Sequence, residues 1–234
     1  MLAVAAMLPL GGAASAEVLI VRSSGPSASS YPPGRQLPDA SKISLKANDM
    51  LVLLDGSGTR TLRGPGEYSA TGSSGQVSDV RTTLAALTSQ RSERRARIGA
   101  VRQFGSPTIW YTDVNWSGRV CIRDESDVTL WRPESDTPMV ATITGANGKA
   151  TVSWPGGEPT AAWPTTLKIV PGSAYTLSWK GVAKPRTISF VSIGADPGGL
   201  EDTAGALIRN GCQAQLDLLI KTVALPDAKP GAKG

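Results

Sequence analysis

The sequence contains no histidine among its 234 residues. This absence excludes Ser-His-Asp and Cys-His nucleophilic sites, zinc sites ligated by histidine, and the side chain that most often transfers protons near neutral pH. Catalysis would need a Ser-Lys pair or two carboxylates. No Ser-x-x-Lys motif precedes an apolar helix, and no phosphate-binding Gly-x-x-x-x-Gly-Lys motif is present. We therefore expect a non-catalytic protein with no cofactor and no metal.

Long apolar runs are also missing, since no stretch approaches the ~20 residues needed to cross a bilayer. Residues 1–16 are uncharged, begin with an apolar run and end in the small residues Ala14, Ser15 and Ala16. This layout is typical of a signal peptide cleaved before Glu17, although the usual basic residue at its start is missing. The alternative is an apolar first helix that is retained. We expect a periplasmic or secreted protein with no membrane span after cleavage.

Cysteine occurs twice, at Cys121 and Cys212, without the spacing of a CxxC motif or a metal site. In an oxidising compartment the simplest use of such a pair is one disulfide, here closing a loop of about 90 residues. The chain-entropy model values such a loop at roughly 3 to 5 kcal/mol of stability. The alternative is two separate buried thiols.

The N-terminal part predicts short strands joined by tight turns. Residues 18–21, 43–46, 50–54 and 59–62 read as strands, and the Ser-, Gly- and Pro-rich residues 23–38 read as a loop. The run from Leu45 to Arg60, closing on Gly64-Pro65-Gly66, resembles the FecR-like domain, an extracytoplasmic β module of bacterial signalling and envelope proteins. The run departs from the family pattern at Asn48, where the family commonly has Gly. The resemblance implies a FecR-like module over residues 17–75 with a sensing or scaffolding role.

A helical stripe follows this module and predicts a basic connecting helix over residues 76–104. Its second half carries four arginines, which form a candidate anion-binding face for a phosphate-rich polymer, a lipid headgroup or an acidic partner: Arg91, Arg94, Arg95 and Arg97. The alternative is the solvated face of a connector. The formal net charge of +5 fits contact with anionic envelope polymers.

All six tryptophans lie between residues 110 and 179, and this shift in composition marks a second domain. Seven short strands separated by Gly, Pro and Asn turns predict an antiparallel β-sandwich over residues 105–195. They cover residues 119–123, 128–131, 140–144, 149–154, 166–170, 174–180 and 187–193. Residues 196–225 predict a helical segment that Asn210-Gly211 can divide, and residues 226–234 predict a disordered tail. The expected fold is mainly β, with a small N-terminal module, a connecting helix, and a sandwich with a C-terminal helix.

Two groups of side chains in the second domain are candidate sites. Three tryptophans near predicted strand ends, Trp131, Trp154 and Trp163, can stack on sugar rings if they are exposed, or can fill the core. A carboxylate cluster can serve hydrolysis or calcium binding, or can form a polar turn, the interpretation that we favour: Asp124, Glu125, Asp127, Glu134 and Asp136.

These features favour a non-catalytic, exported cell-envelope protein that binds or scaffolds a partner protein or an anionic envelope polymer. The resemblance adds a role in envelope sensing. The alternative function is a carbohydrate-binding module that uses surface tryptophans. We expect no nucleic acid partner, and the sequence indicates no oligomeric state.

Overall fold

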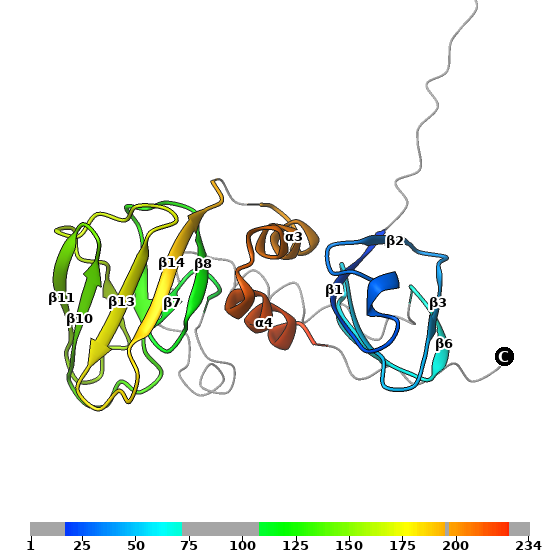
Figure 1. The fold of residues 1–234 in the computed structure, drawn as a ribbon, viewed down its shortest axis with the longest axis horizontal. Helices are drawn as coiled ribbons and strands as arrows, with labels where there is room; N and C mark the ends of the chain where they lie inside the picture. The colour runs from blue at the N-terminus through cyan, green and yellow to red at the C-terminus, as the bar shows by residue number, and fades with distance from the viewer. Residues whose placement is uncertain (1–16, 72–107, 195–196, 225–234) are drawn as a thin grey trace, which may run out of the picture.

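The computed structural model describes residues 17–71, 108–194 and 197–224. The described chain is mainly β, as predicted, and has three parts (Figure 1). A small N-terminal β module and a β-sandwich lie at opposite ends, and two C-terminal helices lie between them. The predicted signal peptide, connecting helix and disordered tail lie outside the described residues.

Six short strands form the N-terminal module: β1 Glu17–Ser24, β2 Gln36–Pro38, β3 Lys42–Leu45, β4 Met50–Asp55, β5 Gly58–Arg63 and β6 Gly66–Ser69. One sheet has the order β2-β1-β4-β5, and β3 pairs with β6. The strands predicted at residues 50–54 and 59–62 are confirmed and form the β4–β5 hairpin, in whose turn the Asp55 carboxylate accepts a hydrogen bond from the backbone N–H of Ser57. Apolar side chains such as Ile20, Leu53 and Leu62 fill the core of the module.

The predicted loop over residues 23–38 is only partly correct. β1 extends to Ser24, and Gln36–Pro38 forms β2, which pairs with β1 so that Leu37 lies opposite Val18. Leu37 is 5% exposed. A strand of three residues is too short to show an alternating pattern in the sequence. Burial of Leu37 and pairing with β1 stabilise it.

The sandwich packs a five-stranded sheet, with the order β11-β10-β13-β14-β8, on a three-stranded sheet with the order β12-β9-β7. Pairing is antiparallel except for β14 with β8 and β7 with β9. The strands are β7 Thr112–Asp113, β8 Gly118–Ile122, β9 Thr129–Trp131, β10 Met139–Gly145, β11 Gly148–Trp154, β12 Thr160–Ala162, β13 Ala174–Trp179 and β14 Arg186–Ser192.

The strand predicted at residues 166–170 is wrong, because this segment is a turn followed by irregular chain. Side chains take up its backbone groups: the indole N–H of Trp163 donates to the carbonyl of Leu167, and the backbone N–H of Val170 donates to the hydroxyl of Tyr175. The third strand of the small sheet is instead β12, just before this segment. Hydrogen bonds to side chains have therefore replaced the pairing that an apolar, β-branched sequence predicts.

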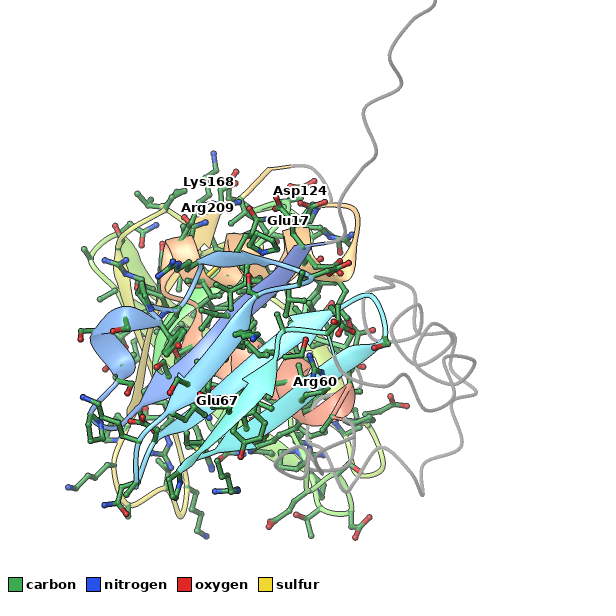
Figure 2. All side chains as sticks on the ribbon, turned by 90° about the vertical axis from the view of Figure 1, so that its right-hand side faces the viewer. Glu17, Arg60, Glu67, Asp124, Lys168 and Arg209 are labelled. Atoms are coloured by element: carbon green, nitrogen blue, oxygen red, sulfur yellow. A yellow bond between two sulfur atoms is a disulfide. The ribbon has the colours of Figure 1, made fainter. Side chains whose placement is uncertain are left out.

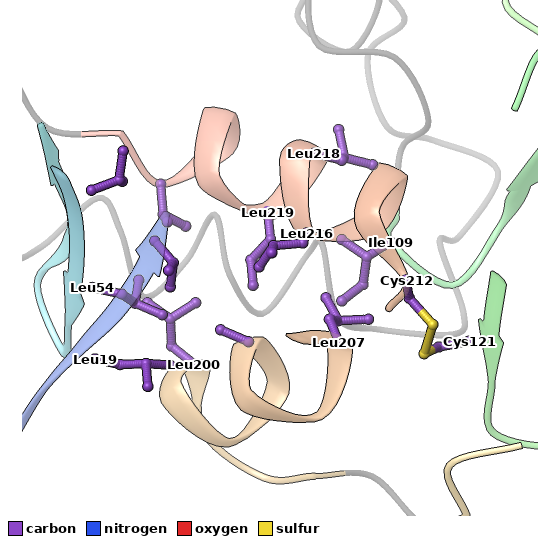
Figure 3. Close-up of a cluster of buried hydrophobic side chains, with 14 of the residues drawn as sticks. Leu19, Leu54, Ile109, Cys121, Leu200, Leu207, Cys212, Leu216, Leu218 and Leu219 are labelled. Atoms are coloured by element: carbon purple, nitrogen blue, oxygen red, sulfur yellow. A yellow bond between two sulfur atoms is a disulfide. The ribbon is translucent and has the colours of Figure 1, made fainter. Parts of the chain in front are cut away.

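The C-terminal helical segment divides at the predicted position. α3 spans Leu200–Asn210 and α4 spans Gln213–Thr222, and Gly211 between them has a φ of 69°, in the left-handed region that favours glycine. The helices fill the space between the two β parts with a shared apolar core (Figure 3). Leu19 and Leu54 enter this core from the N-terminal module.

A disulfide fastens the helices to the sandwich. Cys121 on β8 is joined to Cys212 at the start of α4, with 5.7 Å between their Cα atoms, so the predicted pairing is confirmed (Figure 3). Beside it the fully buried amide of Gln215 accepts a hydrogen bond from the backbone N–H of Cys121. The same amide donates to the carbonyl oxygens of Cys121 and Ile109.

The N-terminal module is fastened to the same helices by noncovalent contacts. The backbone N–H of Thr59 donates to the carbonyl of Val223 at 2.8 Å, and the Thr59 hydroxyl donates to the carbonyl of Ile220 at 3.0 Å. Arg22 forms an ion pair with Asp217 on α4. The two helices therefore join the β parts.

Candidate binding surface

The five-stranded sheet has one buried face and one open face. Ile143, Leu177 and Phe190 point into the sandwich and are fully buried. Because successive side chains along a strand alternate between the two faces, their neighbours point outward. Eight of these outward positions carry hydroxyl groups and form what we call the hydroxyl face: Thr142, Thr144, Thr151, Ser153, Thr176, Ser178, Thr187 and Ser189.

The strand register arranges these residues in rows that run across the sheet. In one row Thr144 lies opposite Thr176, which lies opposite Thr187. In the next row Thr142 lies between Thr151 and Ser178. Neighbouring strands are about 4.8 Å apart and the two rows are roughly 7 Å apart, so the hydroxyl groups form a regular array.

The hydroxyl groups of this face are available to a ligand. None of the eight residues is buried, and Thr144, Thr151, Ser153 and Thr187 are exposed. Within the described parts of the chain, none of the eight side chains makes a hydrogen bond. Since a hydroxyl both donates and accepts hydrogen bonds, the face offers a ligand paired donors and acceptors.

Charge on this sheet has one sign, since none of its five strands carries Asp or Glu. Lys149 lies opposite Thr144 at the β11 edge, and Arg119 lies beside Ser189 at the β8 edge. Both are exposed, and Arg119 also donates to the carbonyl of Asn210 between the helices. A hydroxyl array with a cation at each edge favours an anionic ligand rich in hydroxyl groups.

The helices limit this face at one edge and leave the rest open. Cys121 shares the outward side of β8 with Arg119 and carries the disulfide to α4. Figure 1 shows α3 and α4 beside β8, away from β10, β11 and β13. Val140 on β10, which is 57% exposed, supplies an apolar contact within the open region.

The three candidate tryptophans are in the core, so the hypothesis that they stack on a ligand is wrong. Trp131, Trp154 and Trp163 are 6%, 1% and 7% exposed. The Trp163 ring makes edge-to-face contacts with Tyr175 and Phe190, with 5.2 and 5.1 Å between ring centroids. The sandwich needs these rings as core volume, because a protein with two phenylalanines has few other large apolar side chains.

The carboxylate cluster begins with a polar turn. The Asp124 side chain, labelled in Figure 2, accepts hydrogen bonds from the backbone N–H and the hydroxyl of Ser126. These bonds lower the pKa of the Asp124 carboxyl, so they hold it in the charged form. In the part of the chain that the structure describes, no three Cys, Asp or Glu side chains are placed to hold a metal ion.

A buried arginine in the N-terminal module is structural. Arg60, labelled in Figure 2, donates to the carbonyl of Ala70 and lies beside Asp55. Burial lowers the pKa of its guanidinium, against the opposing charge of Asp55. Arg60 therefore ties β5 to the end of the module.

The candidate anion-binding residues Arg91, Arg94, Arg95 and Arg97 lie outside the described residues. Among the helices described, none is long and apolar enough to cross a membrane. No protein-family model, curated protein or solved structure matches this chain.

The hydroxyl face is not among the sites predicted above, although the sequence carries a signal for it. A Thr-x-Thr or Thr-x-Ser pattern recurs on four strands, beginning at Thr142, Thr151, Thr176 and Thr187. One such pattern is a common polar side of a strand. Only the register, which places the four patterns next to one another, shows that they form a single surface.

Proposed function

We propose that this protein is a non-catalytic component of the bacterial cell envelope that binds an anionic envelope polymer on its hydroxyl face. The observation that carries this proposal is the five-stranded sheet, which lacks acidic residues, has a cation on each edge strand and presents eight hydroxyl groups that make no hydrogen bond to any described residue. A docking surface for a protein would be expected to offer a larger apolar patch. Val140 is the one large apolar side chain of this sheet that is strongly exposed.

In this proposal the protein is exported through a cleaved signal peptide over residues 1–16 and acts in the periplasm or after secretion. The disulfide supports an oxidising destination, because disulfides persist mainly in extracytoplasmic compartments. The absence of histidine supports a non-catalytic role. With the helices holding both β parts together, the protein is suited to scaffolding.

The N-terminal module is, in this proposal, a FecR-like module that gives the protein a sensing or scaffolding role. Its hairpin of β4 and β5 supports the resemblance. Asn48 supports it as well: its φ of 67° lies in the left-handed region, where glycine is favoured and asparagine is the most readily accepted alternative. Asn48 can therefore adopt the turn conformation that glycine adopts at this position in the family.

Calorimetric titration with polygalacturonate of high and of low methyl esterification, and with inorganic polyphosphate, tests the binding function. We expect at least one polymer to bind the full chain, and we expect Thr144→Asp/Thr187→Asp to weaken that binding at least tenfold, because two negative charges enter the row. A matched Thr165→Asp/Thr166→Asp variant, changed at exposed loop threonines, should bind normally. A thermal melt of each variant checks folding. No binding by the unmodified chain, or equal binding by both variants, would refute the proposal.

A further inference from the structure

The position of the two cations on the hydroxyl face restricts the charge density of its ligand. Lys149 lies on β11 and Arg119 on β8, the two edge strands of the sheet. Three strands separate these edges, so four inter-strand steps of about 4.8 Å place the cations roughly 19 Å apart. Between them the outward positions of β10, β13 and β14 carry mainly hydroxyl groups and no Lys or Arg, since Arg186 lies on the same side of β14 as the buried Ile188.

A densely charged polymer fits this arrangement poorly. A single nucleic acid strand carries one charge about every 3.4 Å, and other polyphosphates are comparably dense. Such a chain lying across the sheet would place several charges over neutral hydroxyl groups, where contact removes water without supplying a countercharge. Dense polyanions are therefore disfavoured between the two edges.

A sugar chain fits the same stretch well. Its hydroxyl groups donate and accept hydrogen bonds, as do the hydroxyl groups of Thr142, Thr144 and Thr176. The threonine methyl groups and the exposed Val140 side chain can contact the C–H faces of sugar rings. One anionic group near each edge would then meet Lys149 or Arg119.

Building on the proposed function, we infer that the ligand is an acidic glycan with widely spaced negative charges, lying across the strands from β11 to β8. The hydroxyl rows bind its neutral sugars, and the edge cations bind its carboxylate or phosphate groups. This inference names the polymer class, which the proposed function leaves open.

The first test compares polymers that differ in charge density. Full-length protein is titrated with polygalacturonate whose carboxylates are mostly methyl-esterified, with fully ionised polygalacturonate, with inorganic polyphosphate, and with neutral dextran. We expect the sparsely charged polymer to bind at least tenfold more tightly than polyphosphate or dextran. Tightest binding by polyphosphate would overturn this inference and leave the proposed function standing. Equal binding of dextran, or no binding of any polymer, would overturn both.

The second test measures how binding of the sparsely charged polymer depends on salt. The charges of such a ligand are too widely spaced to hold the condensed counterions of a dense polyanion, so two contacts should give a slope in log affinity against log salt that is shallower than about −1.8. Lys149→Gln should roughly halve the slope. Lys42→Gln, at an exposed strand lysine of the N-terminal module, should leave it unchanged. A slope steeper than about −4, or one that Lys149→Gln does not change, would contradict two-point anchoring.

Discussion

Among single residues, Asp113 at the end of β7 carries a buried carboxyl group whose surroundings raise its pKa. Asp113 is 8% exposed to solvent. Burial raises the pKa of the Asp113 carboxyl, while the hydrogen bond from the backbone N–H of Asn115 and the positive charge of Arg186 oppose this shift. The folded chain therefore holds the Asp113 proton more tightly than the unfolded chain does.

This shift predicts a pH-dependent contribution to stability. Because the folded pKa is raised, the contribution of Asp113 is fully present below the unfolded value of 3.8 and is lost as pH rises through the folded pKa. The free energy of unfolding of the unmodified protein, relative to Asp113→Asn, should therefore fall as pH rises from below 3.8 through the folded pKa. Urea unfolding of both proteins at each pH measures the difference. A difference that is constant or rises with pH would show that burial does not dominate this group.

At the residue scale, the sequence allowed some positions to be predicted and left others undecided. The pairing of Cys121 with Cys212 was the one disulfide available, and Gly211 was a glycine at a helix end, so chemistry alone was enough. Whether Trp131, Trp154 and Trp163 are exposed could not be predicted, because it depends on which side of the sheet each ring occupies. That follows from register and sheet packing, which local sequence does not determine.

Among the secondary structure elements, the attachment of α4 to β8 depends on one buried side chain. Gln215 makes three hydrogen bonds to backbone groups of Cys121 and Ile109. Replacement by leucine would keep most of the volume and would leave those backbone groups buried without this partner. An unsatisfied buried polar group typically costs about 1 to 3 kcal/mol.

We expect Gln215→Leu to lower the free energy of unfolding by about 2 to 4 kcal/mol in guanidinium titrations. The control is Gln213→Leu on the same helix, where the side chain is exposed and donates to Asp217; it should change stability by less than about 0.5 kcal/mol. If the two variants have similar stability, the buried hydrogen bonds do not stabilise this junction.

The accuracy of the strand predictions followed the strength of the local pattern. β13 was predictable because Tyr175 and Leu177 alternate with Thr176 and Ser178, and the β10–β11 hairpin was predictable from Asn147-Gly148. β2 and β12 have three residues each, and only their partners in the sheet define them. Residues 166–170 have strand propensity, but hydrogen bonds to Trp163 and Tyr175 override it.

For the whole molecule, the disulfide acts on a loop that contains most of the sandwich, since its cysteines are 91 residues apart. Cys121→Ala/Cys212→Ala should lower the free energy of unfolding by about 4 kcal/mol, mainly because the unfolded chain regains conformational freedom. Guanidinium unfolding of the variant, and of the unmodified protein with and without reductant, measures this loss. Equal stability of oxidised and reduced protein, or free thiols in the purified protein, would contradict this prediction.

The placement of the C-terminal helices between the two β parts could not be predicted from the sequence. Helical spacing of apolar residues showed that α3 and α4 have a buried side, and the disulfide showed that α4 adjoins β8. That Leu19 and Leu54 of the N-terminal module complete the same core is a contact between distant segments. The hydroxyl face could not be predicted either, because it forms only when four strands are in register.

The most direct test of the account is a map of backbone amide chemical shifts in the labelled full-length protein as sparsely charged polygalacturonate is added. We predict that the shifts change mainly on β10, β11, β13 and β14 and at Arg119 on β8, with Thr142, Thr144 and Thr176 among the residues most affected. The N-terminal module and the Asp124 turn should change little. Changes concentrated in either of those regions, with the four strands unaffected, would contradict the assignment of the hydroxyl face as the binding surface.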